Sequence, residues 1–252
     1  MRFSYNLTNM EYFNFANLLF EANHVLIGGA TGSGKSVLIT DIIYSLIAQY
    51  APDELKFVLI DPKKIDLIQF CPLPHVERHV TENKDIIQTL DEAILTMDKR
   101  YKYMASRGLK EYDGEYIVIV IDEIADLMTT CKKEFMPRVQ RIAQLGRASR
   151  IKIICATQCP KREVIPAQLV VNMNGRVALH CVSPIESRQI INRNGAEDLP
   201  RYGKALYLHS DGQDYTFTIP LLDDEVVKER IEMWRKQTPK LFYIIRKIKH
   251  GF

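Results

Sequence analysis

One run of residues limits the fold more than any other segment of this chain. It is Tyr116-Ile-Val-Ile-Val-Ile121, six residues of apolar, mostly β-branched character. A strand with one face in water alternates apolar and polar residues, and this run does not alternate. It is also far shorter than the roughly 20 apolar residues of a membrane-spanning helix. The run is therefore typical of a strand buried on both faces, as in a parallel sheet covered by helices.

Similar short runs alternate with helical patterns along the chain. The expected strands are 24–28, 56–61, 116–122, 151–156, 176–181, 204–209 and 214–220. Apolar residues spaced three and four positions apart predict helices at 35–49, 83–107, 132–145, 183–193 and 223–236. This alternation predicts an α/β fold with a mostly parallel sheet and helices on both faces.

Composition agrees with a globular protein and excludes several other classes. Hydrophobic residues make up 46% of the 252 residues and charged residues 26%, unlike collagen-like, coiled-coil or disordered chains. The formal net charge is +3, from 34 basic and 31 acidic residues, so any nucleic-acid contact would depend on a local basic patch. The cysteines lack zinc-binding spacing and no apolar leader is evident. We therefore expect reduced thiols and a cytoplasmic location.

A glycine-rich segment predicts a phosphate site. Residues 29–36, GATGSGKS, match the pattern GxxxxGK[ST] between a predicted strand and a predicted helix. Glycines let the backbone curl until successive N–H groups point at phosphate oxygens, beside the positive end of the helix. Lys35 would reach the β- and γ-phosphates, and the Ser36 hydroxyl would bind Mg²⁺. The residues expected to bind ATP are Gly29, Ala30, Thr31, Gly32, Ser33, Gly34, Lys35, Ser36 and Val37.

Polar residues at two strand ends complete the expected site. Asp122 and Glu123 follow the long apolar run. Asp122 would hold Mg²⁺ through water, and Glu123 would polarise the attacking water as general base. Thr157 and Gln158 end another apolar run. Because ligands of parallel sheets bind at the carboxyl ends of strands, we expect Thr157 and Gln158 to sense the γ-phosphate or its water.

Together these segments resemble the motor domain of the FtsK/SpoIIIE family of DNA translocases. The matching stretches are Gly28-Gly-Ala-Thr-Gly-Ser-Gly-Lys-Ser-Val37, Ile60-Asp-Pro-Lys63, Ile121-Asp-Glu-Ile-Ala-Asp-Leu-Met128, Ala156-Thr-Gln158 and Gly195-Ala-Glu197. Their order and spacing agree from about His24 to Gln237. The resemblance implies a RecA-like P-loop core, homo-oligomeric rings that are usually hexamers, and ATP-driven movement of double-stranded DNA. Family chromosome pumps carry a winged-helix module that reads orienting DNA sequences; none is evident in this sequence, so we expect movement without sequence preference.

The resemblance also implies an arginine finger. Gln144-Leu-Gly-Arg147 is similar to the family segment whose arginine reaches the nucleotide of the neighbouring subunit. Arg147 is therefore expected to neutralise charge on the γ-phosphate in trans. Arg150 is the alternative finger.

The DNA-contacting positions match the family only in part. Arg188 agrees with a basic position that contacts phosphates in the family, whereas Cys159 and Pro184 stand where family members have basic residues. Each lost phosphate contact weakens DNA binding. Lys161 and Arg162 lie close by in the sequence and are expected to compensate.

We expect a short amino-terminal segment at 1–23, in which the family's α subdomain is reduced or absent, and a motor domain at 24–238. A basic amphipathic tail at 239–252 is expected to contact a membrane or a partner in a transfer machine.

The leading hypothesis is a compact DNA translocase of conjugative or mobile-element transfer, or of chromosome segregation. Two alternatives stay open: a protein-export ATPase similar to those of type VII secretion, and a nucleotide-gated assembly scaffold.

Overall fold

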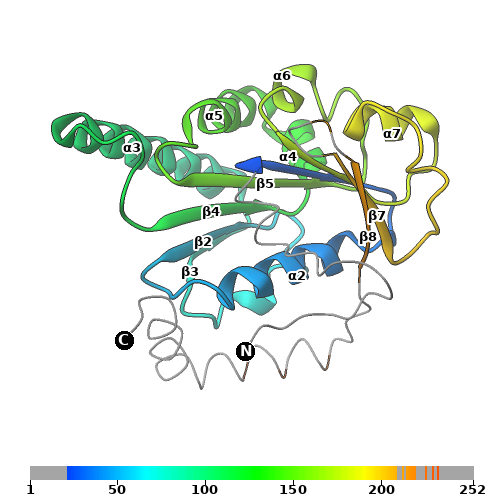
Figure 1. Cartoon of the computed structure of the whole chain (residues 1–252), viewed down its shortest axis with the longest axis horizontal. Helices are drawn as coiled ribbons and strands as arrows, with labels where there is room; N and C mark the ends of the chain where they lie inside the picture. Colours follow the sequence, from blue (N-terminus) through cyan, green and yellow to red (C-terminus); the bar gives the residue numbers. More distant parts are fainter. Residues whose placement is uncertain are drawn as a thin grey trace.

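The structure is a computed structural model, and it describes residues 22–208, 212, 214–219, 225, 229 and 232. Strands within these residues form one sheet in the order β3-β2-β4-β5-β1-β6-β7-β8 (Figure 1). Their bounds are β1 Val25–Gly28, β2 Leu55–Ile60, β3 Val76–Val80, β4 Tyr116–Ile121, β5 Ile151–Thr157, β6 Gly175–Ala178, β7 Lys204–Leu208 and β8 Asp214–Thr218. The six strands from β3 to β6 are parallel, and β7 and β8 are antiparallel to their neighbours.

Helices cover both faces of this sheet, as expected, but unequally (Figure 1). One face carries α2 (Lys35–Ile47) and the short 3₁₀ helix η1 (Ile68–Phe70). The other face carries α3 (Asn83–Arg107), α4 (Ile124–Thr130), α5 (Lys132–Leu145), α6 (Ala167–Val170) and α7 (Pro184–Ile191). None of the described helices combines the length and the apolar character that crossing a bilayer requires.

The burial of β4 explains its unusual composition. β4 lies between β2 and β5. Val118 and Val120 pack in the cluster that includes α2, whereas Ile119 and Ile121 pack in the cluster that includes α3, α4 and α5. All four side chains are fully buried, and burying one such side chain contributes about 1.5–3 kcal/mol. An alternating strand would leave polar groups buried without water at this position.

The expected α/β architecture is confirmed, with small differences at element ends. The helices predicted at 83–107 and 132–145 agree with α3 and α5. The helix predicted at 35–49 ends at Ile47, and the strand predicted at 176–181 ends at Ala178. The helix expected at 223–236 lies largely outside the described residues, and so does the tail at 239–252.

Besides the short 3₁₀ helix η1, the elements that were not predicted from the sequence are β3, α4 and α6. β3 reads Val-Glu-Arg-His-Val and lies at the edge of the sheet, with most of its side chains partly or fully exposed. Because three of its five residues are charged or polar, β3 lacks the apolar pattern from which a strand is predicted. α4 and α6 span only 7 and 4 residues, too few to establish a helical period.

Candidate nucleotide site

The glycine-rich segment links β1 to α2 at the carboxyl edge of the parallel strands. Gly32 and Gly34 have φ angles of 77° and 98°, in the left-handed region that side chains other than glycine rarely adopt. The N–H of Ala30 donates to the carbonyl of His180 (2.8 Å), which ties the loop to the segment after β6. Gly34 precedes α2 without a capping side chain. The first N–H groups of α2 are thus available to an anion.

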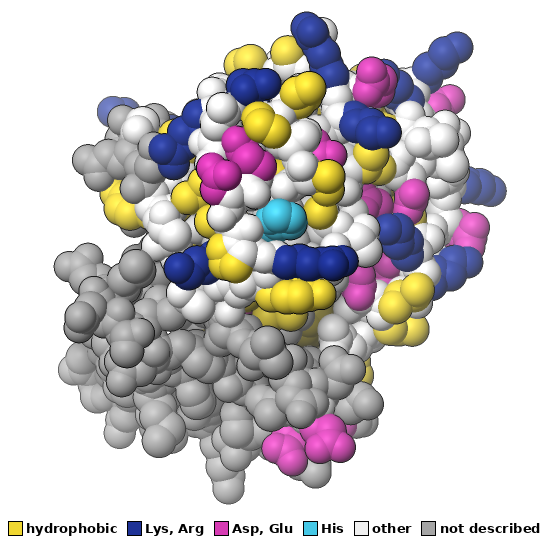
Figure 2. Space-filling model, turned by 90° about the vertical axis from the view of Figure 1, so that its right-hand side faces the viewer, with side chains coloured by type: hydrophobic (Ala, Val, Ile, Leu, Met, Phe, Trp, Pro, Cys, Tyr) yellow, Lys and Arg dark blue, Asp and Glu magenta, His cyan; other side chains and the backbone are white. Residues whose placement is uncertain are grey.

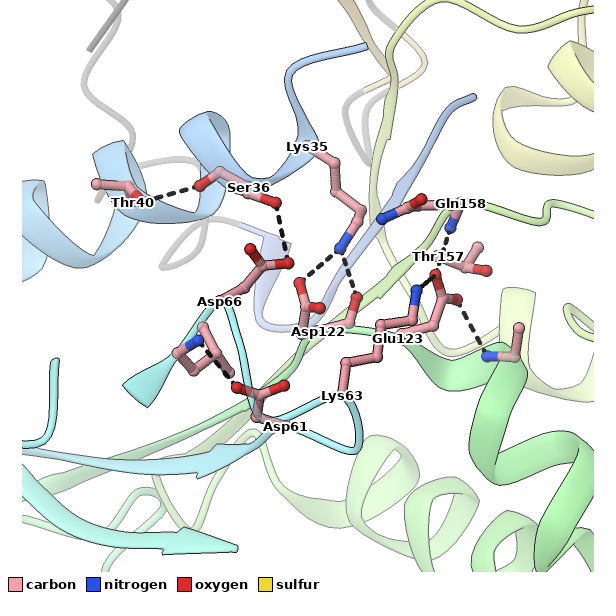
Figure 3. Close-up of polar contacts among 12 residues, drawn as sticks. Lys35, Ser36, Thr40, Asp61, Lys63, Asp66, Asp122, Glu123, Thr157 and Gln158 are labelled. Atoms are coloured by element: carbon pink, nitrogen blue, oxygen red, sulfur yellow. Dashed lines mark hydrogen bonds and ion pairs between the residues drawn. The ribbon is translucent and has the colours of Figure 1, made fainter. Parts of the chain in front are cut away.

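Lys35 and Asp122 form a buried ion pair at the centre of this edge (Figure 3). The Lys35 ammonium donates to Asp122 Oδ1 (2.5 Å) and to the Asp122 carbonyl (2.8 Å). Burial raises the pKa of the Asp122 carboxyl to about 6; Lys35 opposes this change, and Asp66 and Asp61 add to it. Among the described residues, Asp122 Oδ2 has no hydrogen-bond partner. Asp122 Oδ2 is therefore available to bind a cation or a water molecule.

Glu123 is fixed where β4 ends and α4 begins. Its Oε1 accepts a hydrogen bond from the N–H of Ala125 (3.2 Å), as the N-cap of α4. Its Oε2 accepts from the N–H of Gln158 (3.0 Å) and from the Lys63 ammonium (3.4 Å). These three donors hold the carboxylate in one position beside the Lys35–Asp122 pair (Figure 3).

The polar end of β5 joins the glycine-rich loop to Glu123. The Thr31 hydroxyl donates to Gln158 Oε1 (2.9 Å), while the backbone N–H of Gln158 donates to Glu123. The Thr157 hydroxyl accepts a hydrogen bond from the N–H of Cys159 (3.0 Å), which stabilises the turn after β5. Gln158 is thus in direct contact with both sides of the site, and Thr157 lies next to it. Val37, expected at the nucleotide, packs its side chain against the core.

Two further residues reach the site that the sequence analysis left without a role. Lys63 contacts Glu123, and Asp66 accepts a hydrogen bond from the Ser36 hydroxyl (3.2 Å). Both lie in the segment that follows β2. A signal was available, because the sequence analysis ended a strand at Asp61. Since β2 pairs with β4 in parallel, the residue that follows each strand lies at the same edge.

The donors at this edge fit a nucleotide with Mg²⁺. Ser33 Oγ and Asp122 Oδ2 are buried without a hydrogen-bond partner among the described residues, and the first N–H groups of α2 are uncapped. Hydroxyl and carboxylate oxygens from Ser36 and Asp122 suit a hard cation. No group of three or more His, Cys, Asp or Glu in the described part of the chain forms a metal site by itself. When Mg²⁺ binds together with a nucleotide, phosphates and water supply most of its ligands.

The two candidate finger arginines lie near the amino ends of the parallel strands, opposite the glycine-rich loop. Arg147 follows α5 and precedes β5, which is parallel to β1, so it lies far from the glycine-rich loop of its own chain. The Arg147 side chain is exposed. Arg150 donates from Nε to Glu111 Oε1 and from Nη1 to the Gly114 carbonyl, both at 2.9 Å. Its guanidinium also lies 4.7 Å from the centre of the Tyr116 ring. Arg150 is therefore committed to contacts within its own chain.

The basic residues expected to contact DNA lie on the surface near α6 and α7. Arg188 is exposed on α7, and its Nη1 donates to Asn194 Oδ1 (2.6 Å). Lys161 and Arg162 are exposed in the segment after β5. Figure 2 shows basic side chains mixed with acidic and apolar ones on the side of the molecule formed by α7, β7 and β8. The described surface in this view carries no continuous basic patch.

Comparison with known proteins gives consistent matches. A model described as the FtsK/SpoIIIE family matches residues 3–116. The DNA translocase FtsK of Bradyrhizobium diazoefficiens is 32% identical over 257 residues, covering 85% of this chain and 31% of that protein. The DNA translocase FtsK of Clostridium acetobutylicum is 37% identical over 199 residues, covering 73% of this chain and 26% of that protein. The chain thus spans less than a third of the length of these relatives.

Solved structures agree on the fold. The pCW3 conjugation coupling protein TcpA, determined with ATPγS, aligns with a TM-score of 0.75 and 22% identity, over 86% of this chain and 66% of that one. The cytoplasmic domain of the Thermomonospora curvata type VII secretion ATPase EccC aligns with a TM-score of 0.72 and 22% identity, over 84% of this chain and 28% of that one. At these identities the likeness concerns the fold alone.

Proposed function

The chain belongs to the FtsK/SpoIIIE family, and we propose that its residues 24–238 form an ATP-hydrolysing motor that moves double-stranded DNA. The observation that carries this proposal is the position of Glu123. It lies beside the Lys35–Asp122 pair, at the same edge as the glycine-rich loop. A phosphate-binding loop and a fixed carboxylate at one edge are the two parts that hydrolysis of a phosphoanhydride needs.

The residues of the site have distinct tasks in this proposal. Residues 29–36 bind the phosphates through backbone N–H groups, and the Lys35 ammonium exchanges Asp122 for the β- and γ-phosphates. Ser36 and, through water, Asp122 would hold Mg²⁺, which would neutralise charge on the phosphate oxygens. Glu123 orients the attacking water and accepts its proton. Gln158, in contact with Thr31 and Glu123, reports the state of the nucleotide to the end of β5, where Thr157 lies.

We assign the finger to Arg147, acting in trans. Its exposed side chain lies at the edge opposite its own glycine-rich loop, so it can serve a nucleotide only on a neighbouring subunit. Arg150 is less suited because Glu111 and Gly114 already bind its guanidinium. A homo-oligomeric ring, expected to be a hexamer, would bring the amino edge of one subunit against the carboxyl edge of the next.

DNA as cargo is supported by the names of the relatives and by exposed basic residues. Arg188, Lys161 and Arg162 would contact phosphates without reading sequence. The motor would act in the cytoplasm, in conjugative or mobile-element transfer or in chromosome segregation. The tail at 239–252 would attach it to a membrane or a transfer machine.

Protein export is a second candidate, favoured by a specific feature of the same surface. Val182, before α7, and Ile185, in its first turn, are 75% and 70% exposed. Cys159 and Pro184 replace two basic residues of the family. An apolar surface with few basic groups suits a peptide better than a DNA backbone.

Steady-state ATP hydrolysis with and without linear double-stranded DNA, at two salt concentrations, tests the proposal. Strong stimulation that falls with salt is the expected result. The Lys35→Ala variant serves as the control for contaminating ATPases. Hydrolysis that responds to a secretion-signal peptide and ignores DNA would favour protein export instead. Nucleotide-dependent assembly without turnover would favour the scaffold.

A further inference from the structure

The hydroxyl of Ser36 has a partner that none of the expected site residues provides. It donates to Asp66 Oδ2 across 3.2 Å, between residues 30 positions apart in the chain (Figure 3). A serine hydroxyl carries one proton and two lone pairs. Once a fixed acceptor takes the proton, the lone pairs are oriented away from that acceptor and toward a cation.

The backbone around Asp66 is held in place by another carboxylate. Asp61, fully buried at the end of β2, accepts from the N–H of Lys64 (2.9 Å) with Oδ1 and from the N–H of Leu67 (3.1 Å) with Oδ2. Leu67 is itself buried in the core. Asp66 thus lies between two anchored neighbours, on a segment whose ends are fixed.

Asp122 does not take this role in the structure. Its Oδ1 is bound by Lys35, and its Oδ2 makes no hydrogen bond to a described residue. Asp122 and Asp66 are close enough to interact electrostatically, and both lie near Ser36 and Lys35 (Figure 3). The two carboxylates therefore have different roles. Asp122 keeps one oxygen available to the cation, and Asp66 accepts the hydrogen bond from the serine hydroxyl.

We propose that Asp66 is a positioning residue for Mg²⁺, which orients the Ser36 hydroxyl so that its oxygen faces the cation. The inference rests on the proposed nucleotide site and adds to it a carboxylate in the segment after β2. Partners that orient a metal ligand typically change metal affinity by about 10–100-fold when removed. Asp66 does not contact the reacting atoms, so its effect is on Mg²⁺ affinity.

The test is binding of a fluorescent ATP analogue, measured in EDTA and over a range of Mg²⁺ concentrations. For Asp66→Ala, we expect the Mg²⁺ concentration at half-maximal binding to rise about 10–100-fold, with binding in EDTA unchanged. Asp66→Asn keeps a carbonyl acceptor and is expected to fall between wild type and Asp66→Ala. Asp113→Ala is the matched control, because Asp113 is exposed and lies in the segment before β4, toward the opposite edge. It should behave as wild type.

Two results would overturn the inference. One is a wild-type Mg²⁺ dependence in Asp66→Ala. The other is an equal loss of binding with and without Mg²⁺, which would assign Asp66 to loop stability alone. A wild-type protein that binds no nucleotide under any condition would refute the proposed function itself, and the inference with it. The first two results leave the proposed function intact.

Discussion

Lys63 Nζ lies 3.4 Å from Glu123 Oε2, so an ammonium from the segment after β2 contacts the carboxylate at the end of β4. The Glu123 side chain is only 3% exposed, whereas that of Lys63 is 35% exposed. The two strands are neighbours in the sheet. This contact joins two sequence segments that are 60 residues apart at the point where we propose that water is activated.

Lys63→Met is expected to raise turnover without DNA. The ion pair with Lys63 stabilises the ionised form of Glu123. Because Glu123 loses its negative charge when it accepts a proton from water, the pair opposes that proton transfer. Ion pairs with both partners exposed contribute about 0.2–1 kcal/mol. Because Glu123 is buried, we expect the upper end of this range, which corresponds to a rise of about fivefold. The kcat of Lys63→Met and of the exposed control Lys102→Met would be compared. A fall in kcat, or a loss of ATP affinity, would assign Lys63 to phosphate binding instead.

Glu123→Gln is expected to lower kcat by about 10²–10⁴-fold with nucleotide binding retained. Glutamine has nearly the same shape, but it cannot accept a proton from water. Single-turnover hydrolysis and analogue binding would be measured on the same preparation. Asp126→Asn, an acid in the first turn of α4, is the matched control and should turn over as wild type. Comparable rates in Glu123→Gln and wild type would exclude Glu123 as the base.

Arg147→Ala is expected to bind ATP normally and to lose about 10³-fold or more in turnover in assembled protein. Mixing it with Lys35→Ala subunits should restore part of the turnover, since a mixed interface in one of its two orientations combines the intact loop of the Arg147→Ala subunit with the intact arginine of the Lys35→Ala subunit. Failure of the mixture, in assemblies verified to contain both variants, would contradict action in trans.

Arg150→Ala provides the comparison for the finger. Its loss removes the contacts to Glu111 and Gly114, so we expect a lower melting temperature. The melting temperature and the turnover of both variants would be measured together. Below their melting temperatures, Arg150→Ala assemblies should keep turnover, whereas Arg147→Ala assemblies should lose it. The reverse pattern would move the finger to Arg150.

Arg188→Ala is expected to reduce DNA stimulation and to make it less sensitive to salt. Each phosphate contact contributes about one unit to the slope of log affinity against log salt. DNA affinity would be measured over a salt series for this variant, for the pair Lys161→Ala and Arg162→Ala, and for Lys102→Ala, which lies on α3. An unchanged slope in Arg188→Ala would remove it from the DNA interface.

We expect His24 to make the fold sensitive to acid. It is 2% exposed, and its Nδ1 accepts the N–H of Ile153 (3.1 Å). Burial, aided by the charge of Lys152, lowers its pKa from 6.5 to about 3. Between pH 6.5 and pH 3, His24 binds a proton in the unfolded chain but not in the folded one. The contribution of neutral, buried His24 to the free energy of unfolding is therefore complete above about pH 6.5 and is lost as the pH falls toward 3.

His24→Gln tests this effect, because an amide can accept the same hydrogen bond and does not titrate. At pH 5 the expected loss from His24 is about 2 kcal/mol relative to pH 7. Urea unfolding at the two pH values should therefore give a smaller difference for His24→Gln than for wild type. Equal differences in the two proteins would show that His24 is not the acid-sensitive group.

Much of the fold follows from local sequence patterns. The unbroken apolar run of β4 requires burial on both faces, and the 25 residues of α3 carry a clear helical period. The order of elements and the glycine-rich loop follow from the same kind of signal. β3 was missed because an edge strand can be charged and still pair through its backbone.

The sequence by itself determined the strands other than β3, the long helices and the residues at the ends of β1, β4 and β5, because each depends on neighbours within one segment. Only the tertiary structure decided that Lys63 and Asp66 meet Glu123 and Ser36, and that Arg150 is occupied while Arg147 is exposed. Those contacts depend on which strands lie side by side and on what packs at each edge of the sheet. Side-chain contacts between segments 30 or more residues apart leave no periodic trace in the sequence, because they arise only when the sheet assembles.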